Sequence, residues 1–386
     1  MRTRRRGTQR RAGTVQYTVA PMKSPATPAR RARTTRGKAA VRAGTQPARG
    51  RATTINDIAR LSGVSKKTVS RVLNNSPLIR AATRARVQAV IEREKYVPDP
   101  QARGLAFRRS FLIAVVYDNP NAQYIVNILE GALEALRGSD FELLVHPCDR
   151  RNPQLAASVR RFAEKQKLWG VILLPPVSEN NELTRELAAI GCRYVRVSYG
   201  PLDVPERMVA TNDRLAVREA ADYLVSLGHT RIGFITGPSG FMSAGERRVG
   251  FTEALKAHGL KLDPGYMVEG GYTYESGVAG ANLLLSRRPR PTAIFAGNDE
   301  MAAGAYRSAH KLGLRIPEDL SIIGFDDGPL AERMLPSLTT IRLPIRDLGR
   351  RAARRLIGAA EEPATGQFLV PHLVVRDSCA RPRSGV

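Results

Sequence analysis

The sequence predicts a small all-α unit followed by a large α/β domain that contains two parallel sheets. Two patterns carry this prediction. Apolar residues recur at helical spacing between residues 53 and 95. Beyond residue 110, short β-rich apolar runs alternate with helical stretches, which is typical of parallel strands covered by helices on both faces. The segment ahead of both, residues 1–52, has no periodic apolar residues and is expected to be a disordered basic tail.

Charge is distributed unevenly along the 386 residues. Residues 1–52 hold 15 Lys and Arg and no acid, residues 53–109 hold 12 against 4, and the remaining stretch holds 34 against 31. Nearly all of the net charge of +26 therefore lies near the start, as expected if that end meets a polyanion. For the tail itself, three interpretations stay open: phosphate affinity, organelle targeting, or a translation start at Met22.

Several protein classes are disfavoured. The three cysteines are far apart and no Cys/His cluster has zinc spacing, so we expect a reducing compartment, no metal and no cofactor. No apolar run approaches about 18 residues, and no signal-peptide core is present, so we expect a cytoplasmic protein without a membrane partner. The motifs of P-loop, dinucleotide-binding, nucleophile-elbow and HExxH enzymes are missing, and the 5 histidines are scattered. The sequence therefore predicts no enzyme.

Residues 53–97 have the pattern of a helix-turn-helix. In TTINDIARLSG, apolar residues lie near helical spacing, and Thr54 and Asp57 have the spacing of a capping box. Gly63 suits the turn that follows, and Ser65 can cap a second helix that runs through Leu73. A third helix is expected over about residues 80–95. Three short helices with a glycine turn between the first two predict this motif.

The second of these helices, within GVSKKTVSRVLNN, should have one apolar and one basic face. Lys67 and Arg71 are four residues apart and therefore share a face. Solvent exposure or phosphate contact is the simplest interpretation of Lys66 and Lys67, and base contact is the alternative. The expected buried side is formed by Val64, Val69, Val72 and Leu73.

TINDIARLSGVSKKTVSRVLNN and TRARVQAVIEREKYVPDPQARGLA resemble the DNA-binding headpiece and hinge of the LacI/GalR family of bacterial transcription regulators. The resemblance implies that the second helix enters the major groove, where Lys66, Lys67 and Arg71 read base edges. Lysine and arginine suit guanine O6 and N7. Positions that contact phosphates or cap helices in the family are held by Thr54, Thr68, Ser70 and Asn74.

Residues 98–109 resemble the hinge helix of the same family. Pro98 and Pro100 prevent the third helix from continuing. In the family this hinge folds when a dimer sits on its operator, and Leu105 stands where a leucine wedges into the minor groove. Asp99 replaces a common asparagine, and Gly104 weakens the helix by about 0.5–1 kcal/mol relative to alanine. A flexible linker is the alternative interpretation.

The resemblance covers about residues 53–380, and it implies a periplasmic-binding-protein-like effector and dimerisation domain over 110–380, with 381–386 as a tail. The segments that carry it include TRIGFITGP, ERRVGF, AIFAGNDEMAAGA and PEDLSIIGFDD. The chain should cross between two parallel-sheet lobes three times. The expected lobes are residues 110–211 plus 342–362, and residues 212–341 plus 363–380.

Ligands of open α/β sheets bind beyond the carboxyl ends of the strands. The resemblance places seven effector-binding residues there: Asp118, Asn119, Tyr124, Arg196, Arg247, Tyr272 and Asp299. Asp and Arg suit sugar hydroxyls, and an aromatic face suits a sugar ring. Alternatives stay open. Asp299 could cap a helix, Arg247 could lie on the surface, and the tyrosines could belong to the core. Arg196 favours either an anionic ligand or a buried ion pair.

Together these features predict a sequence-specific, DNA-binding transcription regulator, in the form of a repressor of carbohydrate-utilisation genes under allosteric control by a small sugar. Its partners should be double-stranded, pseudo-palindromic operator DNA, the sugar or a derivative, and a second copy of the chain. No leucine heptad follows Asp377, so a homodimer is expected rather than a tetramer. The expected location is the bacterial cytoplasm, at the nucleoid. The alternative is a sugar-binding protein without a regulatory role.

Overall fold

The computed structural model describes residues 53–73, 76, 78–96, 110–261, 263–359 and 368–383. The tail, the hinge over 98–109 with its Leu105, and Asn74 lie outside the described residues, so their predictions stay predictions. The helix-turn-helix and the large α/β domain are described in turn.

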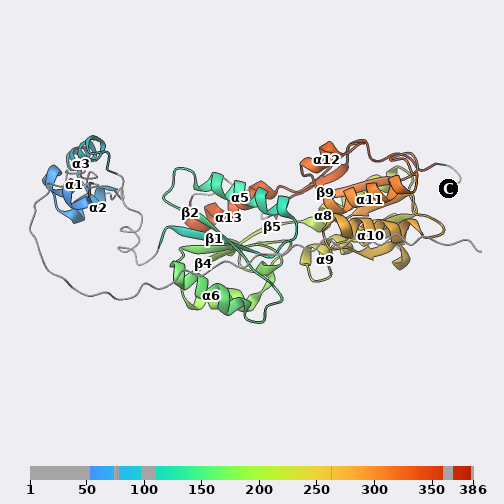
Figure 1. Cartoon of the computed structure of the whole chain (residues 1–386), viewed down its shortest axis with the longest axis horizontal. Helices are drawn as coiled ribbons and strands as arrows, with labels where there is room; N and C mark the ends of the chain where they lie inside the picture. The colour runs from blue at the N-terminus through green and yellow to red at the C-terminus, as the bar shows by residue number, and fades with distance from the viewer. Residues whose placement is uncertain are drawn as a thin grey trace, which may run out of the picture. The chain divides into compact units, whose positions relative to one another are not determined.

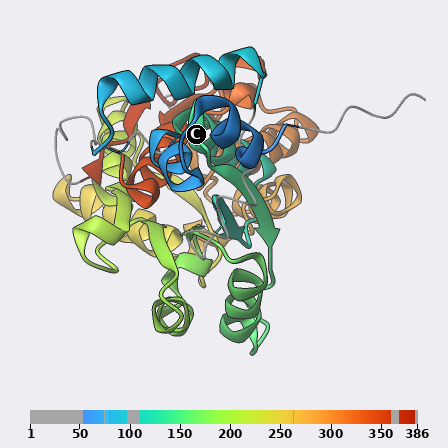
Figure 2. The same ribbon diagram turned by 90° about the vertical axis from the view of Figure 1, so that its left-hand side faces the viewer.

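The headpiece, defined here as residues 53–96, is a cluster of three helices shown in blue and cyan in Figures 1 and 2. They are α1 (Ile55–Ser62), α2 (Lys66–Leu73) and α3 (Ala81–Arg93). Their apolar faces meet in a core formed by Ile58, Ala59, Val69, Val72, Val87 and Val90. The predicted helices are all present, and the third is slightly shorter than expected.

The ends of α1 and α2 follow the predicted capping. Thr54 N–H donates to Asp57 Oδ2 at 3.0 Å, and Asp57 N–H donates to Thr54 Oγ1 at 3.4 Å, which completes the capping box. Gly63 has a φ of 64° at the end of α1, a conformation that glycine adopts without strain. The Ser65 hydroxyl then accepts the Thr68 N–H at 3.1 Å at the start of α2. The turn between the two helices is therefore fixed locally.

The first lobe is built on a six-stranded sheet of order β11-β5-β4-β3-β1-β2 (Figure 1). Its strands are β1 (Leu112–Tyr117), β2 (Glu142–Pro147), β3 (Gly170–Leu173), β4 (Arg193–Ser198), β5 (Met208–Thr211) and β11 (Phe368–Leu369). Its helices are α5 (Ala122–Leu136), α6 (Leu155–Gln166), α7 (Asn181–Ala189) and α13 (Ile345–Ile357), with short 3-10 turns η1 (Val177–Glu179) and η2 (Pro205–Arg207).

The second lobe has a six-stranded sheet of order β12-β10-β9-β8-β6-β7. Its strands are β6 (Ile232–Thr236), β7 (Met267–Glu269), β8 (Ala293–Ala296), β9 (Ser321–Asp326), β10 (Thr339–Arg342) and β12 (His372–Val374). Its helices are α8 (Asp213–Ser226), α9 (Met242–Ala257), α10 (Tyr274–Leu285), α11 (Asp299–Lys311) and α12 (Pro329–Arg333), with the 3-10 turn η3 (Pro264–Tyr266). The described strand pairs are parallel, apart from β10 with β12.

Alternating side chains of each sheet face two helical layers. In β1, Ile113 and Val115 pack with α5 and α13, whereas Ala114 and Val116 pack with α6 and α7. Both faces are therefore buried, which explains why the parallel strands are continuous apolar runs. The second sheet is covered in the same way by α8 and α9 on one face and by α10 and α11 on the other (Figure 1).

One predicted lobe boundary is wrong. The second lobe was expected to resume at residue 363, but Phe368 and Leu369 pair with Ala210 and Thr211 of the first sheet. The chain enters the second sheet only at β12. Two residues with free edge hydrogen-bonding groups are enough to extend a sheet, and such a short strand leaves no periodic pattern in the sequence.

Candidate functional site

The exposed face of α2 is basic. Lys66, Lys67 and Arg71 are exposed, while Val69 and Val72 of the same helix are buried. The first turn of α2 contains no acid that could neutralise this face. Three cations on the solvent side of the second helix of a helix-turn-helix have the placement needed to enter a DNA groove.

The Thr54 and Thr68 hydroxyls make local hydrogen bonds at the starts of α1 and α2. Thr54 belongs to the capping box of α1, and the Thr68 hydroxyl lies 2.9 Å from that of Ser65. Thr68 and Ser70 are partly exposed next to the basic face. Their positions fit residues that hold a helix end in register on a phosphate backbone.

A cleft lies between the two lobes, at the carboxyl ends of their strands. In both sheets the strand order reverses next to the first strand of the lobe, between β1 and β3 and between β6 and β8. Loops that leave such a switch point diverge and make room for a ligand. Two groups meet there across the lobes: Asn121 Nδ2 donates to Asp326 Oδ2 at 2.9 Å.

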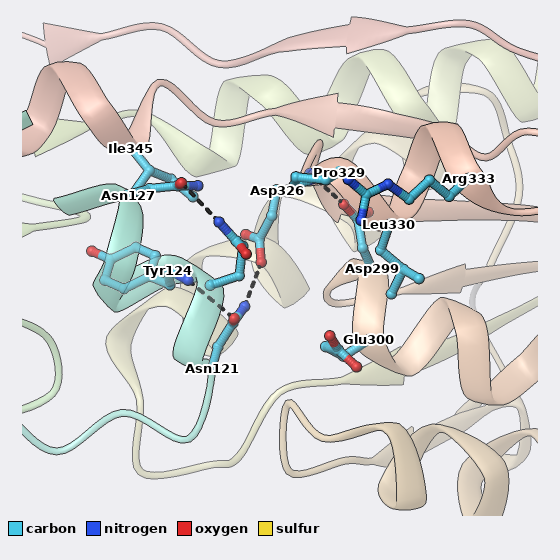
Figure 3. Close-up of a pocket in the computed structure, with 12 residues that line it drawn as sticks. Asn121, Tyr124, Asn127, Asp299, Glu300, Asp326, Pro329, Leu330, Arg333 and Ile345 are labelled. Carbon is cyan, nitrogen blue, oxygen red and sulfur yellow. Dashed lines mark hydrogen bonds between the residues drawn. The ribbon is translucent and has the colours of Figure 1, made fainter. Parts of the chain in front are cut away.

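Two adjoining cavities occupy this cleft. The inner chamber, about 20 Å³, is lined by Asn119, Asn121, Tyr124, Tyr199, Phe241, Ser243, Arg247, Tyr272, Asn298 and Asp326. The outer chamber, about 170 Å³, is drawn in Figure 3 and is lined by Asn121, Gln123, Tyr124, Asn127, Asp299, Glu300, Asp326, Gly328, Pro329, Leu330, Arg333 and Ile345. Their walls combine aromatic surface with a few polar groups, as small-molecule sites do.

Arg247 lies in the wall of the inner chamber and is only 3% exposed. Its Nε donates to Asp213 Oδ2 at 2.8 Å, and its Nη1 donates to the Gly297 carbonyl at 2.6 Å. The guanidinium also lies 3.5 Å from the centroid of the Phe325 ring. Burial is the largest single influence and disfavours its charge, but Asp213 together with Tyr272, Asp326 and Tyr199 more than offsets burial and raises the pKa of Arg247. Arg247 is thus a fixed cation beside the cleft rather than a surface residue.

Asp299 lines the outer chamber, and it is not the helix cap. Asn298 is the N-cap of α11, because its side chain accepts the Met301 N–H at 2.9 Å. The Asp299 carboxyl accepts the Thr340 hydroxyl at 2.6 Å and the Gly328 N–H at 2.9 Å. Burial, followed by the neighbouring Asp326, raises the pKa of Asp299 well above its ordinary value. This side chain joins three segments of the second lobe beneath the cleft.

The predicted aromatic and amide residues also lie at the inner chamber. The Tyr124 hydroxyl is 3.5 Å from that of Tyr199, across the cavity wall. Tyr272, with a φ of 60°, has its hydroxyl 3.0 Å from the Ser243 hydroxyl. The side chain of Asn119 accepts the backbone N–H of Asn121 at 2.9 Å and so shapes the loop after β1.

Two predicted effector residues line neither chamber. Arg196, 2% exposed, donates to the carbonyls of Ser178 and Leu202 and forms an ion pair with Asp203 at 3.5 Å. It lies within β4 rather than beyond its end, so its side chain enters the layer below the sheet. The structure therefore favours the buried-ion-pair interpretation over contact with an anionic ligand.

Asp118 is also misplaced by the sequence prediction. Its Oδ2 accepts the backbone N–H of Arg150 at 2.9 Å, and the side chains of the two residues form a weak ion pair at 3.9 Å. Neither chamber includes Asp118. The carboxylate instead holds the loop after β2 next to the loop after β1.

Sequence reasoning missed Asp326, which faces both chambers. Its backbone has a φ of 115°, a conformation that costs a non-glycine residue about 1–3 kcal/mol and is concentrated at functional sites. Burial raises the pKa of Asp326 to about 7, although Arg247 acts in the opposite direction. The one available signal was its place at the end of the apolar run LSIIGFD. Asn121, Tyr199, Phe241, Ser243 and Asn298 were missed as well.

Metal sites and membrane spans are both absent from the described residues. Within the described residues, no cluster of three or more His, Cys, Asp or Glu has the geometry of a metal site. No helix in the described ranges is long and apolar enough to span a bilayer. The cleft offers hydrogen-bonding groups and aromatic faces, and α2 offers a basic face.

Both the headpiece and the α/β domain resemble known proteins. Residues 54–99 match the model for bacterial regulatory proteins of the lacI family, and residues 221–379 match a periplasmic binding protein-like domain. The transcriptional regulator CelR of Thermobifida fusca is 35% identical over 346 residues, which cover 86% of this chain and 99% of CelR. The ribose operon repressor of Escherichia coli K12 is 32% identical over 333 residues, covering 84% of this chain and 99% of the repressor.

Solved structures give the same result. The complex of the regulator CelR with cellobiose has a TM-score of 0.62 at 32% identity and covers 84% of this chain and 99% of that one. The Lac repressor dimer, bound to operator and the anti-inducer ONPF, has a TM-score of 0.70 at 26% identity and covers 86% of this chain and all of that one.

Fold, headpiece and cleft together define a DNA-binding transcription regulator with a separate ligand-binding domain, and not an enzyme. Two relatives that are at least 30% identical, and that this chain covers almost completely, show which family of regulators it is. The chain belongs to the LacI family of bacterial regulatory proteins. The family resemblance predicted from the headpiece motif is confirmed.

Proposed function

We propose that this regulator represses carbohydrate-utilisation genes and that a small carbohydrate, bound in the cleft between the lobes, controls its affinity for DNA. The contact between Asn121 and Asp326 carries the proposal, because it joins the two lobes inside the cavity that a ligand would enter. A ligand that breaks or replaces this bond changes the angle between the lobes. The CelR–cellobiose complex and the ribose operon repressor support a sugar as the ligand.

At the DNA, Lys66, Lys67 and Arg71 are proposed to read base edges in the major groove. Their exposure on one side of α2 supports this role. We propose that four polar residues contact phosphates or position the headpiece on the DNA: Thr54, Thr68, Ser70 and Asn74. Leu105 is proposed as the minor-groove wedge of a hinge helix over residues 98–109.

The operator is proposed to be double-stranded and pseudo-palindromic, because a homodimer with two headpieces reads two related half-sites. The Lac repressor dimer on its operator supports this arrangement. The proposed site of action is the nucleoid in the bacterial cytoplasm. The proposed domain limits are 53–97 for the headpiece and 110–380 for the effector and dimerisation domain, with tails at 1–52 and 381–386.

In the cleft, Asn119, Tyr124, Arg247, Tyr272 and Asp299 remain the proposed effector-site residues, and Asp326 joins them. Arg247 supports the proposal by its fixed position in the cavity wall, and the tyrosines offer aromatic faces to a sugar ring. The coupling free energy between the two sites is reciprocal. The sugar must therefore change DNA affinity by the same factor by which DNA changes sugar affinity.

Selection of bound DNA from a random pool by the full chain tests this proposal. We expect a two-fold symmetric motif, and a change in the affinity for that motif when the correct sugar is added. Enrichment of no sequence would overturn the assignment as a sequence-specific regulator. A stable monomer on the selected DNA in solution would overturn the homodimer.

A further inference from the structure

The inner and outer chambers meet at one bond. They share Asn121, Tyr124 and Asp326, and the amide of Asn121 donates to the Asp326 carboxyl at 2.9 Å at their junction. Figure 3 shows this bond, with Asn121 reaching from the first lobe toward Asp326 of the second. A molecule that occupied both chambers would lie across this point. Asp326 is therefore placed to contact the middle of such a ligand.

The inner chamber has the walls of a sugar-ring site but little free volume. Tyr124, Tyr199, Phe241 and Tyr272 surround it. Its volume of about 20 Å³ is close to that needed by one water molecule, roughly 10–15 Å³. A ring can enter only when the lobes separate, which breaks the Asn121–Asp326 bond and frees a carboxyl oxygen to accept a new donor.

The outer chamber repeats this mixture of surfaces at a larger size. Leu330 and Ile345 provide apolar surface, while Gln123 and Arg333 are exposed polar residues that line the same cavity. In Figure 3 the side chains of Asn127 and Ile345 come from the first lobe, and those of Leu330 and Arg333 come from the second. An apolar surface beside amide and guanidinium donors suits the C–H face and the hydroxyl edge of a second sugar ring.

The charges of the outer chamber disfavour an acidic ligand. Asp299, Glu300 and Asp326 line it, against Arg333 as the lining cation. An anionic ring would meet Glu300 at short range, where like charges repel, and it would oppose ionisation of the buried Asp299 and Asp326 carboxyl groups. Neutral hydroxyls, by contrast, can donate to them.

We propose that the effector is a neutral two-ring glycoside, with one ring in the inner chamber, the second in the outer chamber, and a hydroxyl near the linkage donating to Asp326 in place of Asn121. This inference rests on the proposed function, since it specifies the ligand of the same cleft. In this proposal, the outer chamber determines whether the ligand has one ring or two.

Titration calorimetry with the full chain tests the inference. The probes are neutral disaccharides, namely cellobiose, maltose and lactose, each compared with its constituent monosaccharides, and glucuronic acid as an acidic ring. We expect at least one disaccharide to bind at least about tenfold more tightly than its monosaccharides. One or two added hydrogen bonds would give an affinity difference of this size. Gln123→Ala and Arg333→Ala should weaken the disaccharide about tenfold more than the monosaccharide. Arg307→Ala is the matched control, because Arg307 is exposed on α11 and lines neither chamber.

The possible failures are distinguishable. Monosaccharides that bind as tightly as the disaccharides, with outer-chamber variants that affect both equally, would overturn the two-ring ligand and leave the sugar-responsive regulator intact. Tightest binding of glucuronic acid would overturn the neutral ligand. If no probe binds while operator DNA does, the carbohydrate effector and the two-ring inference are both overturned, and the DNA-binding role stands.

Discussion

Arg150 stacks on Phe241 across the two lobes, with its guanidinium carbon 4.7 Å from the centroid of the ring. Its Nη1 also donates to the Gly240 carbonyl at 3.0 Å. Asp118, predicted as an effector residue, holds the backbone of Arg150 in place. Phe241 lines the inner chamber, where its ring meets Tyr272 edge-on at 5.5 Å. A ligand that moves Phe241 in the inner chamber would therefore also act on the contact between Phe241 and Arg150, which joins the two lobes.

Replacing Arg150 by alanine should loosen the lobes. The change removes a hydrogen bond and a cation–π contact, together about 1–2 kcal/mol, and leaves the Glu179 contact to the Met242 N–H as a remaining link. Fluorophores placed through unnatural amino acids at exposed Arg137 and His310 would report the distance between the lobes by single-molecule energy transfer. We expect a wider distance distribution in the variant.

The matched control for this change is Arg151→Ala. Arg151 is the exposed neighbour, and its side chain pairs with Asp149 of the same loop at 3.4 Å. It should leave the distribution unchanged. A native-like distribution for Arg150→Ala, or the same widening in both variants, would show that Arg150 does not hold the lobes together.

Lys67→Ala and Arg71→Ala should reduce discrimination between operator and random DNA. A base contact contributes about 1–3 kcal/mol to the correct sequence alone, whereas a phosphate contact weakens binding to all sequences. Fluorescence anisotropy on the selected operator and on a scrambled duplex separates the two effects. Lys256→Ala, at an exposed position on α9, should change neither affinity. Equal losses on both duplexes would assign these cations to phosphates.

The sequence predicted the parts of the fold that depend on neighbouring residues. The Thr54–Asp57 capping box, the Gly63 turn and the split of α2 into buried and exposed sides all follow from spacing within a few residues, and the structure has them. Longer apolar runs such as FLIAVVY were predicted as strands and form β1. The short edge strand β11 was missed, because two residues leave no periodicity to detect.

The site was less predictable, because its residues meet through the tertiary fold. Asn121 and Asp326 are 205 positions apart and come from different lobes, so no local pattern links them. Arg196 shows the opposite problem. The run RYVRVSY placed it near the end of a strand, but alternation along β4 directs the side chain into a buried layer, where carbonyls and Asp203 satisfy it.

Stability should fall as the pH rises toward neutrality, because of Asp326. Its pKa of about 7 in the folded chain exceeds the value of about 3.9 expected in the unfolded chain. Between about pH 4 and about pH 7 the folded state therefore binds more protons, and its stability decreases with pH by up to ~4 kcal/mol. The charged groups that act on this carboxyl are Arg247, Asp213, Asp299 and Glu300.

Asp326→Asn tests this dependence, because asparagine cannot release a proton. Urea unfolding at about pH 5 and about pH 8 should give a smaller stability difference in the variant than in the native chain. Asp299, whose pKa is also raised by burial, keeps part of the slope. Equal slopes in the two proteins would show that Asp326 is ionised throughout this range. Asp377→Asn, at an exposed position, is the control for removal of a carboxylate.

Gly237→Ala should abolish the response to sugar while it preserves DNA binding. A Cβ at this position would lie 2.1 Å from Tyr272 Cζ, well inside contact distance. The ring has little freedom to move away, because its hydroxyl contacts Ser243 and its edge packs on Phe241. Overpacking of this kind costs about 1–3 kcal/mol and displaces the wall of the inner chamber.

Gly245→Ala in α9 is the matched control. A Cβ there meets no atom within 4 Å, and alanine should stabilise the helix by about 0.5–1 kcal/mol. Operator affinity measured with and without sugar separates the two variants. A Gly237→Ala protein that still responds to sugar like the native chain would show that Tyr272 is not part of the effector site.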